Sequence, residues 1–369
     1  MTEGQPLRIL HVVRAPVGGI FRHILDLANG QIGRGHHVGI IADSITGGER
    51  AAVALAEIEP RLKLGVHRVA IRREPRFADF MVWAQIVRLI WQLKPDVLHG
   101  HGAKAGAYVR LRPRSKNRIR VYTPHGGSLH YPLDALKGKF YSYLERFLMS
   151  STDLFLFESA FARDTYQRTV GTPGGPVRCV FNGVTADEFD PIVKADDGTD
   201  LVYVGGADLL IDAVAKLRAE GTPVTLTLGG DGEEFETLKA QVKRLSLKDA
   251  VHFIGHVKAR YGFSRGGLLV VPSRGDSMPY VVIEAGAAEV PMIGANVGGI
   301  PEIFDTLTDA LFAPSNVNAM AVAIKKSLHD PNATQARAQV LRERIFTHFS
   351  QQAMVDGVLA GYRDALAKN

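Results

Sequence analysis

A buried strand leads into a helix within the stretch Val271-Pro-Ser-Arg-Gly-Asp-Ser-Met-Pro-Tyr-Val-Val-Ile-Glu-Ala285. The apolar strand ends at Pro272, a polar loop follows, and Pro279 falls where the first turn of a helix tolerates proline. In parallel α/β sheets the edge where strands end and helices begin is the one that binds ligands. The stretch therefore predicts a strand–loop–helix unit whose helix N-terminus faces a ligand site.

The same alternation of short apolar strands and helices continues in both directions from this stretch. Strands are predicted at residues 8–13, 37–42, 97–99, 118–123, 154–157 and 177–180, and again at 201–204, 224–229, 251–254, 268–271 and 292–294. Helices are predicted between them, for example at 20–30 and 77–93. This pattern predicts an α/β fold made of two Rossmann-like, doubly wound domains in series.

The length of 369 residues also favours two domains that meet at a cleft. The break is predicted in the polar stretch 185–199, where Pro191 and Gly198 interrupt regular structure. We therefore expect domains over 1–184 and 185–348. A final helix, 349–369, is expected to pack back on the N-terminal domain.

Cysteine usage and hydropathy indicate the compartment. The single cysteine, Cys179, excludes an intramolecular disulfide and a zinc cluster built on cysteines. No apolar run approaches the roughly 20 residues that a membrane-spanning helix needs. We expect a cytoplasmic protein, at most peripheral on the inner face of the membrane.

Charge is divided unevenly along the chain. Residues 1–183 contain 26 Lys and Arg against 14 Asp and Glu, a net charge of +12 within a total of +6. The basic density peaks at Arg110, Arg112, Arg114, Lys116, Arg118 and Arg120. An anionic membrane surface is one candidate partner, and a solvated basic turn is the alternative. Nucleic acid is not expected, because no aromatic residues alternate with these charges to stack on bases.

Two segments of the first half are candidate site residues. Gly18 and Gly19 follow the first strand and lead into a helix, where an anionic group can approach the backbone; the alternative is a purely steric need for glycine at a tight turn. His125 follows another strand, between proline and glycines, and a structural role in packing is its alternative.

Two carboxylates bracket the predicted helix N-terminus in the second half. Asp276 lies in the loop and Glu284 lies within the helix, where both can accept hydrogen bonds from hydroxyl-rich ligands. Neither needs to bind a metal. The alternative is a helix cap and a solvated acid.

At these positions the chain resembles the retaining glycosyltransferases of family 4, which have the GT-B fold. The resemblance extends over nearly the whole length, and its motifs are Gly18-Gly19, the His125 loop, Asn182-Gly183-Val184, Gly229-Gly-Asp-Gly232, Phe253-Ile-Gly-His256 and the stretch from Asp276 to Glu302. The family usually has glutamate where this chain has Asp276, so the reach of that carboxylate is one methylene shorter.

The resemblance implies transfer of a sugar with retention of configuration, without a metal or a cofactor. The donor is expected to be a UDP- or GDP-linked sugar bound by the C-terminal domain, and the acceptor a lipid-linked or polysaccharide molecule of cell-surface synthesis on the N-terminal domain. His125 and Asp276 are the implied catalytic residues. The implied donor-binding residues are Gly18, Gly19, Ser277, Met278, Pro279, Tyr280 and Glu284, with Glu284 on the ribose.

A second departure from the family concerns the donor diphosphate. Family members usually carry an arginine and a lysine in the loop after the first strand of the donor domain, but here Gly206 runs directly into Ala207. Arg14, Lys258 and Arg260 are the candidate replacements. Two alternative functions stay open: a nucleotide-sugar 2-epimerase, which shares the GT-B fold and needs no acceptor, and a non-catalytic relative that acts as a binding protein, which the missing loop suggests.

Overall fold

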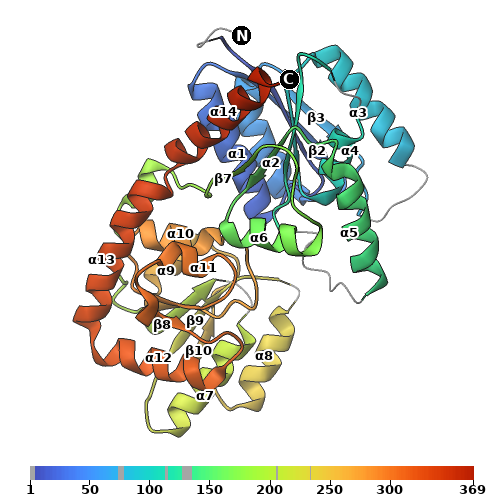
Figure 1. Ribbon diagram of the computed structural model, residues 1–369. Helices are drawn as coiled ribbons and strands as arrows, with labels where there is room; N and C mark the ends of the chain where they lie inside the picture. The colour runs from blue at the N-terminus through green and yellow to red at the C-terminus, as the bar shows by residue number, and fades with distance from the viewer. Residues whose placement is uncertain (1–4, 74–78, 113–114, 127–134, 205–206, 233) are drawn as a thin grey trace. The chain divides into compact units, whose positions relative to one another are not determined.

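The computed structural model describes the chain except for residues 1–4, 74–78, 113–114, 127–134, 205–206 and 233. The chain divides into two compact units (Figure 1). The N-terminal unit contains Met1–Gly183 together with Gln351–Asn369, and the C-terminal unit contains Val184–Ser350. The final helix, α14 (Gln351–Ala367), thus belongs to the N-terminal unit although it ends the chain.

The N-terminal unit is built on a seven-stranded parallel sheet in the order β3-β2-β1-β4-β5-β6-β7. Its strands are β1 (Arg8–Val13), β2 (His37–Asp43), β3 (Val66–Val69), β4 (Val97–His101), β5 (Ile119–Thr123), β6 (Leu154–Phe157) and β7 (Val177–Cys179). Strand order reverses between β1 and β4, and the carboxyl ends of such a pair form the usual ligand crevice of doubly wound sheets.

Helices cover both faces of this sheet because its strands are apolar on both sides. The helices are α1 (Gly18–Gly33), α2 (Gly48–Ile58), α3 (Asp79–Leu93), α4 (Ala103–Arg110), α5 (Leu136–Met149) and α6 (Ala160–Thr169), besides α14. Alternate residues of β1 face different cores: Ile9 packs with residues of α1 and α14, and Leu10 packs with α3 and α4. In Figure 1, α14 runs beside α1, and the two helices are in contact.

The C-terminal unit repeats this plan with a six-stranded parallel sheet in the order β10-β9-β8-β11-β12-β13. Its strands are β8 (Thr199–Val204), β9 (Leu226–Gly229), β10 (Val251–Phe253), β11 (Gly266–Val271), β12 (Met292–Ala295) and β13 (Leu311–Phe312). Its helices are α7 (Asp208–Ala219), α8 (Phe235–Arg244), α9 (Ala259–Ser264), α10 (Tyr280–Ala287), α11 (Ile300–Phe304), α12 (Val317–His329) and α13 (Pro331–His348). The reversal of strand order lies between β8 and β11.

The predicted fold class is confirmed, and every predicted strand is present with ends shifted by a few residues at most. The pattern missed β3 and β13, which are short strands at the sheet edges. No helix among the described residues is long and apolar enough to cross a membrane.

Candidate functional site

The glycine turn after β1 starts a long helix. α1 begins at Gly18, two residues before the predicted start, and Gly18 has φ of +60°, a left-handed conformation that favours glycine. Val17 precedes the helix in extended conformation without a side-chain cap, so the amides of Gly18 and Gly19 begin a helix end that is suited to an anion.

His125 is held in a strained conformation just beyond β5. Its φ is +52°, and Gly126 follows with φ of +72°. A non-glycine residue in the left-handed region is uncommon, and such residues gather at functional sites. The half-buried imidazole of His125 therefore has a backbone geometry typical of a functional residue.

His125 is one member of a cluster of five histidines, which we call the histidine cluster: His11, His23, His99, His101 and His125. His11 lies on β1 opposite His99 of β4, and His101 lies two residues further along β4 on the same side. His23 comes from α1, and its ring centroid lies 4.9 Å from that of His125. The cluster therefore occupies the β1–β4 reversal of strand order.

Hydrogen bonds join three of these rings into a row. His101 Nδ1 lies 3.0 Å from His125 Nε2, and His101 Nε2 lies 3.0 Å from His11 Nδ1. The row ends at α1, where His11 Nε2 lies 2.9 Å from Gln31 Oε1. Both ring nitrogens of His11 and of His101 thus form hydrogen bonds.

The two other rings are bound separately. His99 Nδ1 lies 2.7 Å from the hydroxyl of Tyr362 on α14, and its Nε2 lies 2.8 Å from Thr123 Oγ1. His23 Nδ1 lies 3.0 Å from Asn182 Oδ1, which gives a local role to the Asn182-Gly183-Val184 motif. α14 thus contributes to the site through Tyr362.

Burial keeps all five rings uncharged at neutral pH. It lowers the pKa of His11 to about 4, against a small rise caused by the bond to Gln31, and it lowers the pKa of His125 to about 3. For His23, His99 and His101, burial and then repulsion among the rings hold the pKa well below 6.5. The cluster therefore offers neutral imidazoles, which act as hydrogen-bond donors, acceptors or metal ligands.

Two triads of the cluster have the spacing of metal ligands: His11 with His99 and His101, and His23 with His101 and His125. Within each triad the ring nitrogens lie within 4.8 Å of one another. Both triads include His101, whose two nitrogens are bonded to neighbouring rings. A metal ion would have to replace those bonds.

Sequence reasoning identified only His125 in this cluster. The signal for three of the others was the presence of His11, His99 and His101 within two otherwise apolar strand segments. Because β1 and β4 are neighbours in the sheet, those positions meet; that adjacency requires the strand order, which the pattern of elements does not specify.

The loop between β11 and α10 is the corresponding feature of the C-terminal unit. α10 begins at Tyr280, so Pro279 is its N-cap residue and not its first helical residue, and no side-chain cap is present. A second loop lies tightly against this one: the amide of Gly299 donates to the carbonyl of Asp276 at 2.9 Å. A Cβ atom on Gly298 would lie only 1.8 Å from that carbonyl oxygen. Glycine is required there, and this second loop, which lies within the stretch from Asp276 to Glu302, thereby supports Asp276.

The two predicted carboxylates of this unit lie around the start of α10. Asp276 accepts a bond from the Met278 amide at 3.3 Å, and both Asp276 and Glu284 are half-buried. The side chains of Met278, Pro279 and Tyr280 are buried, so these residues offer a ligand their backbone, whereas Ser277 is half-buried. These residues are close together within one strand–loop–helix unit.

The loop between β11 and α10 carries one cationic side chain, that of Arg274. The Arg274 guanidinium pairs with Asp208, the first residue of α7, and this bond lowers the pKa of the Asp208 carboxyl against the opposing effect of burial. Of the replacement cations predicted from sequence, Arg260 donates to the backbone carbonyls of Glu188 and Asp190 and is engaged elsewhere. The predicted departure at Gly206 lies outside the described residues.

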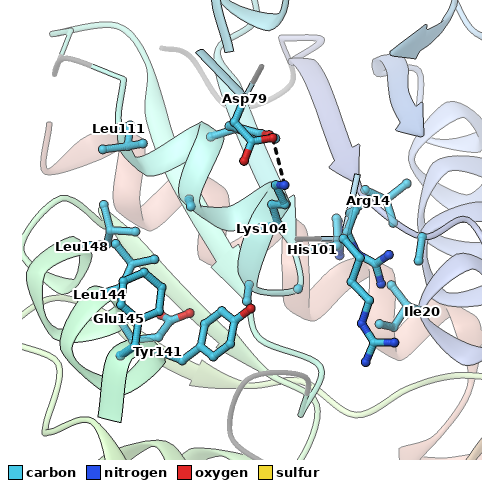
Figure 2. Close-up of a pocket in the computed structure, with 18 residues that line it drawn as sticks. Arg14, Ile20, Asp79, His101, Lys104, Leu111, Tyr141, Leu144, Glu145 and Leu148 are labelled. Atoms are coloured by element: carbon cyan, nitrogen blue, oxygen red, sulfur yellow. Dashed lines mark hydrogen bonds and ion pairs between the residues drawn. The ribbon is translucent and has the colours of Figure 1, made fainter. Parts of the chain in front are cut away.

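An apolar cavity of about 360 Å³ lies within the N-terminal unit (Figure 2). Its apolar wall is formed by Ala107 of α4, by Leu111 just beyond the end of α4, and by Phe140, Leu144 and Leu148 of α5. Figure 2 shows Arg14 and Ile20 across the cavity from Leu144 and Leu148, with Lys104 paired to Asp79 at 2.9 Å. The cavity also reaches His101, so it is continuous with the histidine cluster.

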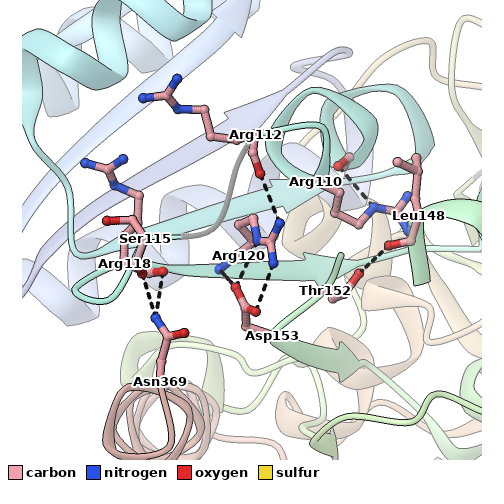
Figure 3. A network of polar contacts seen from close by, with 10 residues as sticks. Arg110, Arg112, Ser115, Arg118, Arg120, Leu148, Thr152, Asp153 and Asn369 are labelled. Carbon is pink, nitrogen blue, oxygen red and sulfur yellow. Dashed lines mark hydrogen bonds and ion pairs between the residues drawn. The ribbon is translucent and has the colours of Figure 1, made fainter. Parts of the chain in front are cut away.

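Two of the six cations of the basic segment 110–120 are buried and paired with acids, and Figure 3 shows one of them, Arg120, bonded to Asp153. Arg110 is buried, pairs with Glu145 at 2.8 Å and stacks over the Tyr122 ring. Arg120 is buried and bonds to both oxygens of Asp153. These two charges are therefore not free, whereas Lys116 is exposed, and the membrane-surface and solvated-turn interpretations of the segment stay predictions.

Comparison with known proteins identifies the family. The profile described as Glycosyltransferase Family 4 matches residues 17–188, and that described as Glycosyl transferases group 1 matches residues 199–344. The chain is 25% identical to a glycogen synthase of Mycobacterium tuberculosis over 94% of this chain and 91% of that protein. It is 27% identical to the gpi3 subunit of phosphatidylinositol N-acetylglucosaminyltransferase of Schizosaccharomyces pombe, over 78% of this chain and 64% of that protein.

Solved structures show the same architecture. HepE of Anabaena in complex with UDP-glucose superposes with a TM-score of 0.77 at 18% identity, over 98% of this chain and 100% of that one. The fold is therefore GT-B, with two Rossmann-like units. With both profiles matched in succession, the chain belongs to the glycosyltransferases of the family 4 type.

Proposed function

We propose that this glycosyltransferase retains anomeric configuration and moves a sugar from a UDP- or GDP-linked donor onto an acceptor that is anchored at a membrane. The observation that carries the donor half is the clustering of Asp276, Arg274 and Glu284 around the start of α10. A helix end supplies amides for phosphate oxygens, and carboxylates accept bonds from sugar and ribose hydroxyls. HepE, which has this fold, was solved in complex with UDP-glucose, and this complex supports a nucleotide-sugar donor in the proposal.

In this proposal the charge of the leaving diphosphate is carried by amides and by Arg274, without a metal ion. Arg274 exchanges its bond with Asp208 for one with phosphate. Such a cation stabilises the transition state more than the bound donor, because negative charge grows on the phosphate as the sugar bond breaks. From the N-terminal unit, His125 contacts the sugar, and the helix end at Gly18 and Gly19 contributes amides.

The acceptor half rests on the apolar cavity and on α5. Leu136, Phe140, Tyr143 and Phe147 repeat at helical spacing and are between 53% and 86% exposed, so they form one apolar face of α5, which we call the α5 face. Exposed apolar faces of this kind mark interaction surfaces. Phe140 lies both on this face and in the wall of the cavity, which joins the two features. We propose that the α5 face contacts lipid and that the cavity receives the apolar part of the acceptor.

The donor half is tested by calorimetric titration of UDP- and GDP-linked hexoses into the wild type and two arginine variants. Arg274→Met is expected to weaken donor binding about tenfold, because a hydrogen bond between charged groups contributes about 1.5 to 3 kcal/mol. Arg265→Met is the matched control, since Arg265 also pairs with an aspartate, Asp197, in the same unit. Equal donor affinity in all three proteins would contradict the donor site.

The acceptor half is tested by narrowing the cavity with Ala107→Phe. The KM for an acceptor with a long apolar chain should rise severalfold, while the KM for the donor stays the same. Ala84→Phe, on the exposed side of α3, is the control. Nuclear magnetic resonance of the product then reports the configuration of the new bond, and inversion would contradict the proposed retention.

A further inference from the structure

The chain of hydrogen bonds that joins Gln31, His11, His101 and His125 has a direction, because each bond runs from a donor to an acceptor. A neutral imidazole has one N–H donor and one bare nitrogen that accepts. His11 and His101 are fully buried and each bonds through both nitrogens, so each must donate on one side and accept on the other. If the direction of one bond in the row is known, the direction of all the others follows.

Gln31 decides that direction because it closes the row at its buried end. Its amide oxygen faces His11 Nε2 at 2.9 Å, and an oxygen can only accept, so His11 carries its proton on Nε2. His11 Nδ1 is then bare and accepts from His101 Nε2–H. His101 Nδ1 is bare in turn and accepts from His125 Nε2–H.

The orientation of the Gln31 amide is supported by Tyr362. The Gln31 side chain lowers the pKa of the Tyr362 phenol against the larger rise that burial causes, and only an amide N–H has that effect. Within the described residues the amide nitrogen has no partner at normal hydrogen-bond geometry, so the interaction with Tyr362 is a weak one. The structure places the oxygen of the same amide against His11 Nε2, and this contact is the geometric basis of the assignment.

His125, whose backbone is in the left-handed conformation, lies at the other end of the row. Its Nε2 is engaged by His101, and its Nδ1 forms no hydrogen bond with any described residue. A flipped Gln31 would reverse every bond in the row, and His125 would then present an N–H at Nδ1 where it now presents a lone pair. The two states differ in which substrate atoms they can bind.

We propose that Gln31 sets the tautomer of His125 through His11 and His101, so that His125 offers a bare Nδ1 as the acceptor for a hydroxyl group of the bound sugar. Gln31, His11 and His101 are positioning residues that need not touch the substrate. The hydroxyl contact rests on the proposed function, whereas the tautomer itself does not.

The tautomer is measured by nuclear magnetic resonance on the full chain labelled with ¹⁵N-histidine at pH 7. Protonated and bare ring nitrogens have distinct ¹⁵N shifts, and the His125→Asn spectrum identifies the His125 signals. We expect the proton of His125 on Nε2 in the wild type. A wild-type proton on Nδ1 would overturn the proposal.

Three variants test whether Gln31 is the cause. Gln31→Met keeps the length of the side chain and removes both polar atoms, so His125 should become a mixture with a severalfold larger Nδ1–H fraction. His11→Phe breaks the same row at the next ring and should give the same result if Gln31→Met fails to fold. Thr123→Val, which removes the partner of His99 outside the row, should leave His125 unchanged. A His125 tautomer that stays on Nε2 in both row variants overturns the proposal.

Kinetics test the hydroxyl contact separately. If only the Nε2–H form binds the sugar, kcat/KM for the donor should fall in proportion to the measured fraction of that form. A changed tautomer with unchanged kcat/KM would overturn the contact. It would leave the proposed function standing, because Arg274→Met tests that function without involving this row.

Discussion

The two units have the same strand order but place different chemistry at its reversal. In the N-terminal unit β1 and β4 carry neutral histidines, and in the C-terminal unit the loop after β11 carries Arg274 and Asp276 beside a helix N-terminus. Both lie where doubly wound sheets usually bind ligands. The difference shows that the sheet determines where a site lies, while the residues after each strand determine what it binds.

The two units also differ in how far their histidines are shielded from water. The histidine cluster is built from strands inside the unit, and four of its five rings are buried. The four histidines of the C-terminal unit, His252, His256, His329 and His348, are all exposed. Low pH should therefore act on one unit much more strongly than on the other.

The largest expected effect is acid unfolding that begins in the N-terminal unit. The pKa of each cluster histidine is lower in the folded chain than the ordinary 6.5, so the unfolded chain binds protons first as pH falls. Stability is thus fully present above about pH 7. Between pH 6.5 and about 4 each ring lowers the free energy of unfolding by up to about 1.4 kcal/mol per pH unit.

Hydrogen exchange followed by mass spectrometry at pH 7 and pH 5 resolves the two units within the intact chain. After correction for intrinsic exchange rates, peptides of β1, β4 and β5 should lose protection at pH 5, and peptides of β8 and β11 should keep it. Equal loss in both units would mean that the buried histidines do not govern acid stability.

The second prediction compares two glycines in the left-handed conformation, one at each site. Gly298→Ala should weaken donor binding by more than tenfold, because its Cβ would lie 1.8 Å from the Asp276 carbonyl and the loop must move. Gly18→Ala meets no atom within 4 Å, so only backbone strain of about 1 kcal/mol is expected. Calorimetric titration of the donor distinguishes them. Similar losses in both variants would refute the argument from close contact.

How far the sequence could predict each site follows from the same comparison. Asp276, Pro279 and Glu284 belong to one continuous strand–loop–helix unit, so spacing alone placed them correctly around a helix start. The histidine cluster draws on β1, β4, the segment after β5 and α1, with Tyr362 from the far end of the chain. No local pattern joins such distant segments.

In the basic segment the sequence suggested more free charge than the fold contains. Arg110 and Arg120 add to an apparent cluster of charge along the chain, but their partners Glu145 and Asp153 lie 35 and 33 residues away. Counting charges along a sequence does not show which of them are paired in the fold. The α5 face was missed for a related reason, because apolar residues at helical spacing normally predict burial.

The third prediction concerns Glu284, which we expect to bind the donor ribose and to take no part in proton transfer. Glu284→Gln keeps the shape and removes the charge, so donor affinity should fall roughly tenfold, since a charged hydrogen bond contributes about 1.5 to 3 kcal/mol. The pH profile of the rate should keep its shape. A new pH optimum in this variant would show that Glu284 transfers a proton.

The smallest expected effect concerns the α5 face of the N-terminal unit, which has no histidines or paired acids and acts through apolar contact. Tyr143 and Phe147 are more than half exposed on this face, and Lys139 and Arg146 are exposed on the same helix. Apolar side chains then enter the lipid interface while nearby cations attract anionic headgroups. Phe147→Ser should weaken binding to vesicles that contain anionic lipid by about tenfold or less, since partial insertion of one such side chain contributes less than the about 1.5 to 3 kcal/mol of its full burial. Phe346→Ser, on an exposed position of α13, is the matched control in the other unit.

Sedimentation with vesicles at low and high salt separates the two contributions, because salt screens only the attraction of Lys139 and Arg146. Equal losses in the two phenylalanine variants, or binding that does not depend on either, would show that the α5 face has another partner.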